Sequence, residues 1–421
     1  MVASVLRTTI GIFLLLAALL QPVTRPASPP VPPEFFGLSI HPHTGLTQDL
    51  WPSLQFGGIR LWDTGTQWNE INTARGTYDW TMLDAWFERA RVHHVDVLYT
   101  FGGTPTWASA APNRLCWPGH AKGDCMPPAN LKDWDDFVRA LVAHSAGRIK
   151  YWELWNEADS RDFWSGGAPS LVEMARRAYN IIKTADPTAI VLTPSGTGAA
   201  SDIQRWLETY LDAGGGAYAD AIAFHGYPNP DPPEPEYVMH TLDLLSQVLV
   251  AHHQTSKPVW DTEASWGANT RLPDAGEQGG FVARLYALEW SRGVQRLYWY
   301  AWQDRTYGTL WNSNHGLLPS GRAYAEIHNW LVGAKMAAPC TQGPESIWSC
   351  ELARPGGYIA RIVWSAANPQ TYVAESQFVQ WRDLDGNSTP IRRQLWIGHR
   401  PILLENRSDP RTLSAGLPVS K

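Results

Sequence analysis

Between Phe36 and Leu331, short apolar runs alternate with longer stretches in which apolar residues recur at helical spacing. A short apolar strand followed by an amphipathic helix is the pattern of a βα unit, and repeated units build a parallel sheet. The apolar runs predict eight strands: Phe36–Ile40, Gly58–Trp62, Asp96–Phe101, Lys150–Trp155, Ala189–Leu192, Ala221–Phe224, Pro258–Asp261 and Arg296–Trp299. Eight such strands close a barrel, so we expect an α/β fold, a (β/α)8 TIM barrel.

Two of the intervening helices show start signals. Ser170 with Glu173, and Ser201 with Gln204, have the spacing of capping boxes, in which two side chains satisfy free backbone amides at a helix start. Behind the first box, one apolar face repeats at helical spacing: Leu171, Met174, Ala175, Ala178 and Ile182.

The helical pattern stops near Ala334, and a small β-rich appendage is expected beyond it. Its strands are predicted at Tyr358–Trp364, Thr371–Glu375, Phe378–Arg382 and Gln394–Ile397, with a turn at Asp385–Gly386. We therefore divide the chain into a signal peptide and proline-rich linker over 1–33, a catalytic barrel over 34–334, and a small β-rich domain over 335–421 that packs on the barrel.

The amino terminus has the pattern of an export signal, with Arg7, an apolar stretch over 10–20 and a proline-rich segment over 21–33. The apolar stretch is shorter than the roughly 20 residues of a membrane span, although an uncleaved signal anchor stays open. We expect a secreted or periplasmic protein. Export favours disulfides, and the cysteines form two close pairs, Cys116 with Cys125 and Cys340 with Cys350.

The composition limits the classes of partner and ligand that the protein is expected to bind. A net charge of -6 shows no basic field, so nucleic acid is not an expected partner. The chain has 23 Trp and 15 Tyr, more than a core alone needs, and aromatic rings also stack on the flat faces of sugars. An oligo- or polysaccharide is therefore the expected ligand.

Two acidic residues follow predicted strands at matching places. The run Tyr151–Glu157 ends in Asn156 and Glu157 after the fourth strand, and the seventh strand delivers Glu263. In a parallel barrel both lie at the carboxyl-terminal mouth, where active sites form. Two carboxyl groups in different protonation states are what cleavage of a glycosidic bond requires.

The surrounding motifs resemble a known group of enzymes. Gly58-Ile-Arg60, His225-Gly-Tyr227 and Trp299-Tyr-Ala-Trp302 stand at further strand ends, beside Trp-Asn-Glu157 and Glu263. This set resembles the large clan of retaining (β/α)8 glycoside hydrolases that includes cellulase-like family 5 and xylosidase-like family 39. The third strand end, Phe101-Gly-Gly-Thr-Pro105, is closer to family 39.

The resemblance implies roles for the site residues. Glu157 would be the acid/base, Glu263 the nucleophile and Asn156 the residue that binds the sugar 2-hydroxyl. Further substrate-binding residues implied are Arg60 and Tyr227, which would keep Glu263 ionised and oriented, His225, and Trp302 with Trp299 as its rival for the floor of the sugar site.

Other readings of single residues stay open. A second Trp-Asn-Glu occurs at residues 68–70, after polar residues, so we expect Glu70 in a loop and outside the chemistry, while Trp68 could touch substrate. Glu153 and Asp261 are expected to be structural partners of barrel arginines such as Arg60. The His pairs lack further ligands at zinc spacing, so no metal and no cofactor are expected.

The sequence therefore predicts an exported retaining glycoside hydrolase that cleaves O-glycosidic bonds of a polysaccharide by double displacement. Five tryptophans near strand ends would suit an extended groove and endo action: Trp68, Trp107, Trp117, Trp164 and Trp266. The alternatives are an exo-acting, xylosidase-like β-glycosidase, a transglycosylase using the same intermediate, and a carbohydrate-binding barrel without catalysis.

Overall fold

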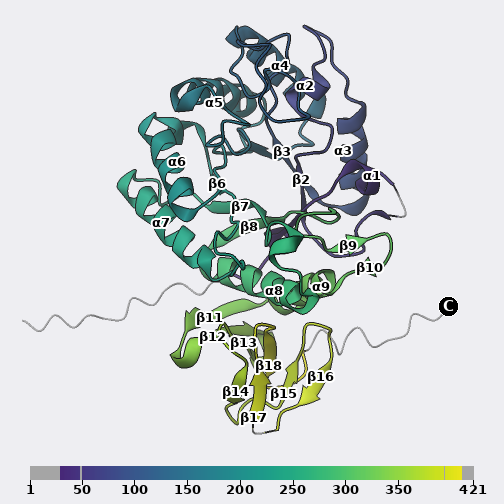
Figure 1. The fold of residues 1–421 in the computed structure, drawn as a ribbon, viewed down its shortest axis with the longest axis vertical. Helices are drawn as coiled ribbons and strands as arrows, with labels where there is room; N and C mark the ends of the chain where they lie inside the picture. Colours follow the sequence, from purple (N-terminus) through teal and green to yellow (C-terminus); the bar gives the residue numbers. More distant parts are fainter. Residues whose placement is uncertain (1–28, 48–49, 393, 410–421) are drawn as a thin grey trace, which may run out of the picture.

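The computed structural model describes residues 29–47, 50–392 and 394–409. Eight parallel strands form a nearly closed barrel with helices around it (Figure 1). The barrel strands are β1 (Phe36–Ser39), β2 (Gly58–Leu61), β3 (Asp96–Thr100), β4 (Tyr151–Glu153), β5 (Ile190–Leu192), β6 (Ile222–Phe224), β7 (Val259–Ala264) and β8 (Val294–Trp299). Their order is β5-β4-β3-β2-β1-β8-β7-β6, and a bridge from Leu192 to Ala221 joins β5 to β6. The predicted TIM barrel is confirmed, with a strand at each of the eight predicted places.

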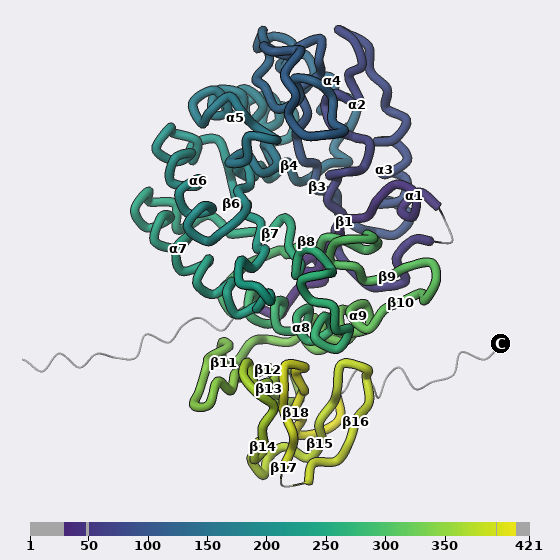
Figure 2. The backbone as a smooth tube through the Cα atoms, viewed as in Figure 1, coloured from purple at the N-terminus to yellow at the C-terminus, as the bar shows by residue number. Residues whose placement is uncertain are grey.

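The long helices lie outside the strands, as the tube in Figure 2 shows for the ring from α3 to α9. The α-helices are α1 (Pro42–Gly45), α2 (Trp68–Ile71), α3 (Thr81–His93), α4 (Leu131–Ser145), α5 (Gly167–Ala185), α6 (Ala200–Asp212), α7 (Tyr237–Ala251), α8 (Ala275–Ser291) and α9 (Pro319–Leu331). The predicted apolar face of α5 is buried throughout, from Leu171 to Ile182. Burial of this stripe fixes the helix against the barrel.

The two predicted capping boxes are wrong. Helix α5 begins at Gly167, so Ser170 lies inside its first turn, and its hydroxyl donates to the Gly166 carbonyl at 2.7 Å. Helix α6 begins at Ala200, and the Asp202 carboxylate accepts from the amide of Ala199 at 3.3 Å. Both helices start a residue or more before the predicted serine, and the hydroxyl of Ser170 bonds backwards to a carbonyl instead of capping.

Beyond α9 the chain forms a β-sheet region that lies below α8 and α9 in Figure 1. Its strands are β11 (Lys335–Gln342), β12 (Ile347–Arg354), β13 (Tyr358–Ser365), β14 (Gln370–Val373), β15 (Gln380–Arg382), β16 (Ser388–Pro390), β17 (Gln394–Ile397) and β18 (Ile402–Glu405). Side-chain contacts join this region to the barrel; among them, Trp364 Nε1 donates to Glu236 Oε1 at 2.7 Å, and His399 Nδ1 lies 2.7 Å from Glu277 Oε2. The four predicted strands are present, while the boundaries assigned to the three parts of the chain stay a prediction.

The predicted export signal lies mostly in residues 1–28, outside the described residues, and stays a prediction. Among the residues that the structure describes, none of the helices has the length and apolar character needed to cross a membrane.

Candidate active site

Arg60 on β2 is the centre of the group of polar residues at the barrel mouth. Its side chain is fully buried, and it donates from Nε to Glu153 at 2.8 Å, from Nη1 to Glu263 at 2.6 Å and from Nη2 to Asn156 Oδ1 at 2.7 Å. Burial lowers the pKa of the guanidinium, but the carboxylates of Glu153 and Glu263 outweigh burial and raise it. One permanent charge therefore ties β2 to β4 and β7, and Glu153 is the arginine partner that the sequence predicted.

Both carboxylate oxygens of Glu263 have donors. Arg60 occupies Oε2, and the hydroxyl of Tyr227 donates to Oε1 at 2.8 Å. Thr262, the preceding residue, points into the barrel and donates to Glu153 at 2.9 Å. The pairing of β7 with β8 has a register shift between Asp261 and Ala264, and such an irregularity re-aims a side chain that simple alternation would send outward.

Glu157 stands four residues past the end of β4 in a left-handed backbone conformation, with φ of 42°. Few residues with a Cβ adopt this conformation, and it is held here by a hydrogen bond from the Glu157 amide to Ser195 Oγ at 3.2 Å. The side chain meets His225 Nδ1 at 3.0 Å. The turn therefore brings Glu157 to the side of the mouth that faces β6.

His225 is fully buried and connects Arg60 to Glu157. Its Nε2 lies 3.3 Å from Arg60 Nη2, and a guanidinium can only donate. Nε2 then has to accept, so the proton sits on Nδ1 and is donated to Glu157 Oε1. The histidine thus orients Glu157 in the same network that orients Glu263.

The two acids lie close enough to act on one bond. An oxygen of Glu157 and an oxygen of Glu263 lie within 4.8 Å of each other, and a ring nitrogen of His225 is equally near. Retaining glycosidases place their carboxyl groups about 5–5.5 Å apart, and inverting ones leave a wider gap. A cation at this spot would face the Arg60 guanidinium, which already occupies Glu263 at 2.6 Å, so the residues present do not suit a metal.

The surroundings of the two acids shift their pKa values in opposite directions. Burial and the neighbouring Glu157 raise the pKa of Glu263, and His225 and Arg60 only partly offset them. Burial also acts on Glu157, but the hydrogen bond from His225 outweighs it and lowers the pKa of that carboxyl. Without substrate Glu157 is therefore the more easily ionised acid, which is the reverse of what an acid/base and a nucleophile need.

The aromatic residues predicted to meet substrate are placed differently. Trp68 is buried on α2 and stacks on Phe137, and Trp299 is buried and donates from Nε1 to the Gly308 carbonyl at 2.7 Å. Trp302 is only 1% exposed and packs on Trp311. All three side chains are buried among other residues, and their assignment to substrate binding stays a prediction.

Tyr300 is the aromatic side chain that the sequence analysis missed. It directly follows β8, its hydroxyl donates to Asp63 Oδ2 at 2.8 Å, and His41 Nε2 lies 3.3 Å from the Tyr300 hydroxyl oxygen. Burial raises the pKa of the Tyr300 phenol, and the negative charges of Asp63 and Glu263 raise it further. The sequence did hold a signal that could have identified Tyr300, namely its position one residue past the predicted eighth strand.

Glu70 was expected in a loop outside the chemistry, and Asp261 was expected to be a structural partner of an arginine. Glu70 on α2 accepts from the amide of Gln67 at 2.8 Å, so the second Trp-Asn-Glu caps a short helix. Asp261 is not an arginine partner, and that prediction is wrong. Its Oδ1 accepts from the backbone amides of Gly226 at 3.0 Å and Glu263 at 3.2 Å, because alternation along β7 turns it outward from the barrel interior.

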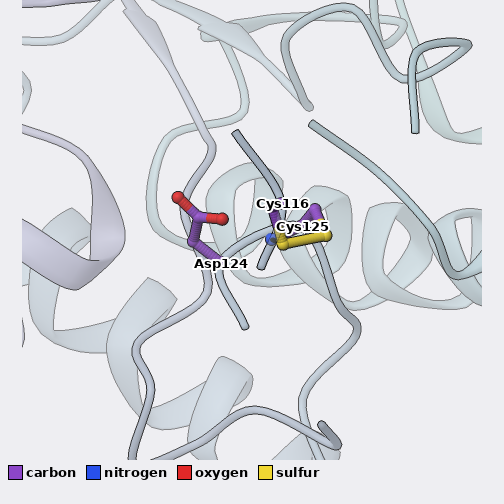
Figure 3. Close-up of side chains that lie close together, drawn as sticks. All are labelled: Cys116, Asp124 and Cys125. Carbon is purple, nitrogen blue, oxygen red and sulfur yellow. Dashed lines mark hydrogen bonds between the residues drawn. A yellow bond between two sulfur atoms is a disulfide. The ribbon is translucent and has the colours of Figure 1, made fainter. Parts of the chain in front are cut away.

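Both predicted disulfides are present. Cys340 bonds Cys350 between β11 and β12, and Cys116 bonds Cys125 in the long loop after β3. Figure 3 shows the second bridge beside the Asp124 carboxylate. Both sulfurs there are used in the disulfide, so this group offers no thiolate to a metal.

Comparison with known proteins agrees with this geometry. The family described as glycosyl hydrolase catalytic core matches residues 128–324, which include β4, β7 and both acids. Over these residues the chain is similar to a glycosidase catalytic core. Over 183 residues it is 26% identical to a beta-xylosidase from Geobacillus stearothermophilus, and the match covers 40% of this chain and 34% of that protein. The chain thus spans about a third of the length of this curated relative.

Solved structures extend the likeness to the β-sheet region. A family 39 glycoside hydrolase from Bacteroides cellulosilyticus matches with a TM-score of 0.68 and 18% identity, over 89% of this chain and 80% of that one. A family 39 beta-xylosidase from Caulobacter crescentus matches with 0.64 and 19%, over 90% and 98%, and a family 30 endoxylanase from Clostridium papyrosolvens with 0.60 and 11%, over 90% and 97%. The structural likeness concerns the fold, and with the family match it confirms the resemblance of this chain to the retaining clan close to family 39.

Proposed function

We propose that this protein is an exported retaining glycoside hydrolase that cleaves β-xylosidic bonds by double displacement. The observation that carries the proposal is the approach of Glu157 and Glu263 within 4.8 Å, with Arg60 and Tyr227 both donating to Glu263. The close spacing leaves room for a sugar carbon to be attacked directly, without an intervening water. The two disulfides support export, since such bonds persist in oxidising compartments.

Each residue then has a defined part. Glu157 gives its proton to the leaving oxygen while Glu263 attacks the anomeric carbon, and the glycosyl–enzyme ester forms with inversion. Glu157 next removes a proton from water, which attacks the same carbon, displaces Glu263 and restores the original configuration. The oxygen of Asn156 accepts from Arg60, so its amide nitrogen remains to donate to the sugar 2-hydroxyl.

Substrate binding supplies the protonation state that the free site lacks. The side chain of Glu157 is 16% exposed, and a sugar lying over it would remove that water. Loss of water disfavours the charged form and raises the pKa of a carboxyl. Glu263 keeps the guanidinium and the phenol, whose hydrogen bonds favour its ionised form. We therefore assign the proton of the enzyme–substrate complex to Glu157.

The substrate is proposed as a terminal β-linked xylose. A beta-xylosidase is the curated relative, and a second beta-xylosidase shares the fold. Of the five tryptophans that favoured an extended groove, three are buried, namely Trp68, Trp164 and Trp266. Their burial removes most of the support for endo action and favours the exo-acting alternative.

Glu157→Gln is expected to separate the two halves of the reaction. On xylobiose, whose leaving group needs a proton, kcat/KM should fall by about 10²–10⁴-fold. On dinitrophenyl β-xyloside, which needs none, the first step should persist and release a burst of phenol. Nuclear magnetic resonance of the first sugar formed by the wild-type protein should show the β-anomer.

Glu70→Gln is the matched control, because it changes the acid of the other Trp-Asn-Glu and should leave turnover unchanged. An α-anomer as first product would contradict retention. Binding of xylo-oligosaccharides by the wild-type protein without any product would instead favour the carbohydrate-binding barrel.

A further inference from the structure

Two carboxyl groups meet in the protein core behind the nucleophile. Asp261 lies on β7 and Glu289 on α8, and both are 0% exposed. Among the described residues, no N–H or O–H of a third side chain reaches Asp261 Oδ2 or either oxygen of Glu289. The two carboxyls meet at one point beside Gly226, and a hydrogen bond between them requires a proton on one of the two.

The other oxygen of Asp261 holds the backbone of the active site. Asp261 Oδ1 accepts from the amide of Glu263 at 3.2 Å and from the amide of Gly226 at 3.0 Å. Gly226 stands between His225, which orients Glu157, and Tyr227, which orients Glu263. A single carboxylate oxygen thus fixes the nucleophile and the segment that supports both acids.

Residue 226 has to be glycine for this contact to exist. A Cβ built there would lie 2.0 Å from Asp261 Oδ2 and 3.2 Å from Glu289 Oε1. These two distances show that both carboxyls lie close to residue 226, under the His225–Tyr227 segment. The segment rests directly on the acid pair.

The proton belongs to Glu289. Burial raises the pKa of Asp261 to about 7, against the bond from Glu289, the nearby His225 and the two amides, all of which favour its ionised form. Glu289 has no amide donors, and burial with the charge of Asp261 raises its pKa much further. Facing the pair, Tyr286 on α8 is itself buried and its pKa is raised by burial, so it stays neutral.

We propose that Glu289 donates a hydrogen bond to Asp261 and is a positioning residue for Glu263 and for the His225–Tyr227 segment. The kinetic part of this proposal rests on the proposed glycosidase activity. The pair itself is defined by its geometry alone. Glu289 touches no substrate and acts only through the orientation that Asp261 gives to the backbone.

Two substitutions at residue 289 test the role. Glu289→Gln keeps a donor for Asp261 in the same volume, so kcat on aryl β-xyloside should stay within about threefold of wild type. Glu289→Leu removes the donor, and loss of positioning should lower kcat by about 10–100-fold with KM nearly unchanged. Glu405→Gln, a buried glutamate on β18, is the matched control and should change neither constant.

The pH dependence of unfolding gives a readout that needs no turnover. A carboxyl whose pKa is raised on folding contributes stability at low pH and loses it as pH rises through the folded pKa. The melting temperature of the wild-type protein should therefore fall more steeply from the ordinary glutamate pKa of about 4 upward than that of Glu289→Gln, whose amide cannot lose a proton. The ring signals of His225 in nuclear magnetic resonance should shift in Glu289→Leu and not in Glu289→Gln.

Three outcomes would overturn the proposal: equal loss of kcat in both variants at residue 289, wild-type kcat in Glu289→Leu, or the same pH dependence of melting in the wild-type protein and Glu289→Gln. If the wild-type protein hydrolysed no glycoside, the proposed function would fail instead, and melting and the His225 signals would still decide the pair.

Discussion

Glu263→Ala is expected to abolish hydrolysis, with kcat on dinitrophenyl β-xyloside falling by about 10⁴–10⁶-fold, as removal of a nucleophile does in other enzymes that work through a covalent intermediate. No other described carboxylate combines donors on both oxygens with a place opposite Glu157. The variant should remain folded, because it removes a raised-pKa carboxyl from a buried place. Circular dichroism checks the fold and release of the phenol checks the rate.

Azide identifies the role that was lost. In Glu263→Ala, a small anion can enter the space left by the carboxylate and attack the anomeric carbon once, so the product should be the α-glycosyl azide. In Glu157→Gln the glycosyl–enzyme still forms, and azide should displace Glu263 to give the β-azide. Exchange of these two configurations would mean that the roles of the acids are reversed, and wild-type turnover in Glu263→Ala would exclude it from the reaction.

The barrel could be predicted from the sequence because its strands are buried on both faces and appear as apolar runs, such as Ala221–Phe224. The positions of Glu157 and Glu263 followed from the same rule, since parallel strands present their carboxyl ends at one mouth. The partners Arg60 and Tyr227 came from the resemblance, and the structure brings both to Glu263.

The remaining details depend on contacts distant in sequence. Simple alternation along β7 would place Asp261 and Glu263 on one face, and only the register shift against β8 separates them. Whether a strand-end aromatic ring faces the mouth or the helices depends on its neighbours, which is why Tyr300 was missed while Trp302 was chosen. The pairing of Asp261 with Glu289 joins a strand to a helix, and no local pattern signals it.

Arg60→Met is expected to have the largest effect on stability. The substitution leaves Glu153, Glu263 and the Asn156 oxygen without their shared donor in a site where Arg60 and Glu153 are 0% exposed. Breaking a buried ion pair by removing one partner costs about 3–5 kcal/mol, so the free energy of unfolding in urea should fall by that amount. Arg91→Met, which breaks an exposed pair with Glu88, is the control and should cause no measurable change.

The sign of the pH dependence separates loss of this pair from loss of packing. In the wild-type protein, burial opposes ionisation of Glu153, but Arg60, His225 and Thr100 outweigh burial and hold its pKa below the ordinary value. This contribution to stability is present above the ordinary glutamate pKa and is lost as pH falls through the folded value.

In Arg60→Met the charge of Arg60 is gone, so burial should outweigh the remaining neighbours of Glu153 and raise the pKa of its carboxyl. The stability of the variant should then fall as pH increases. The deficit of the variant should therefore grow from about pH 4 upward, and a second change, Glu153→Gln, should recover part of it. A deficit that is the same at every pH would show that Arg60 acts by filling space and not by its charge.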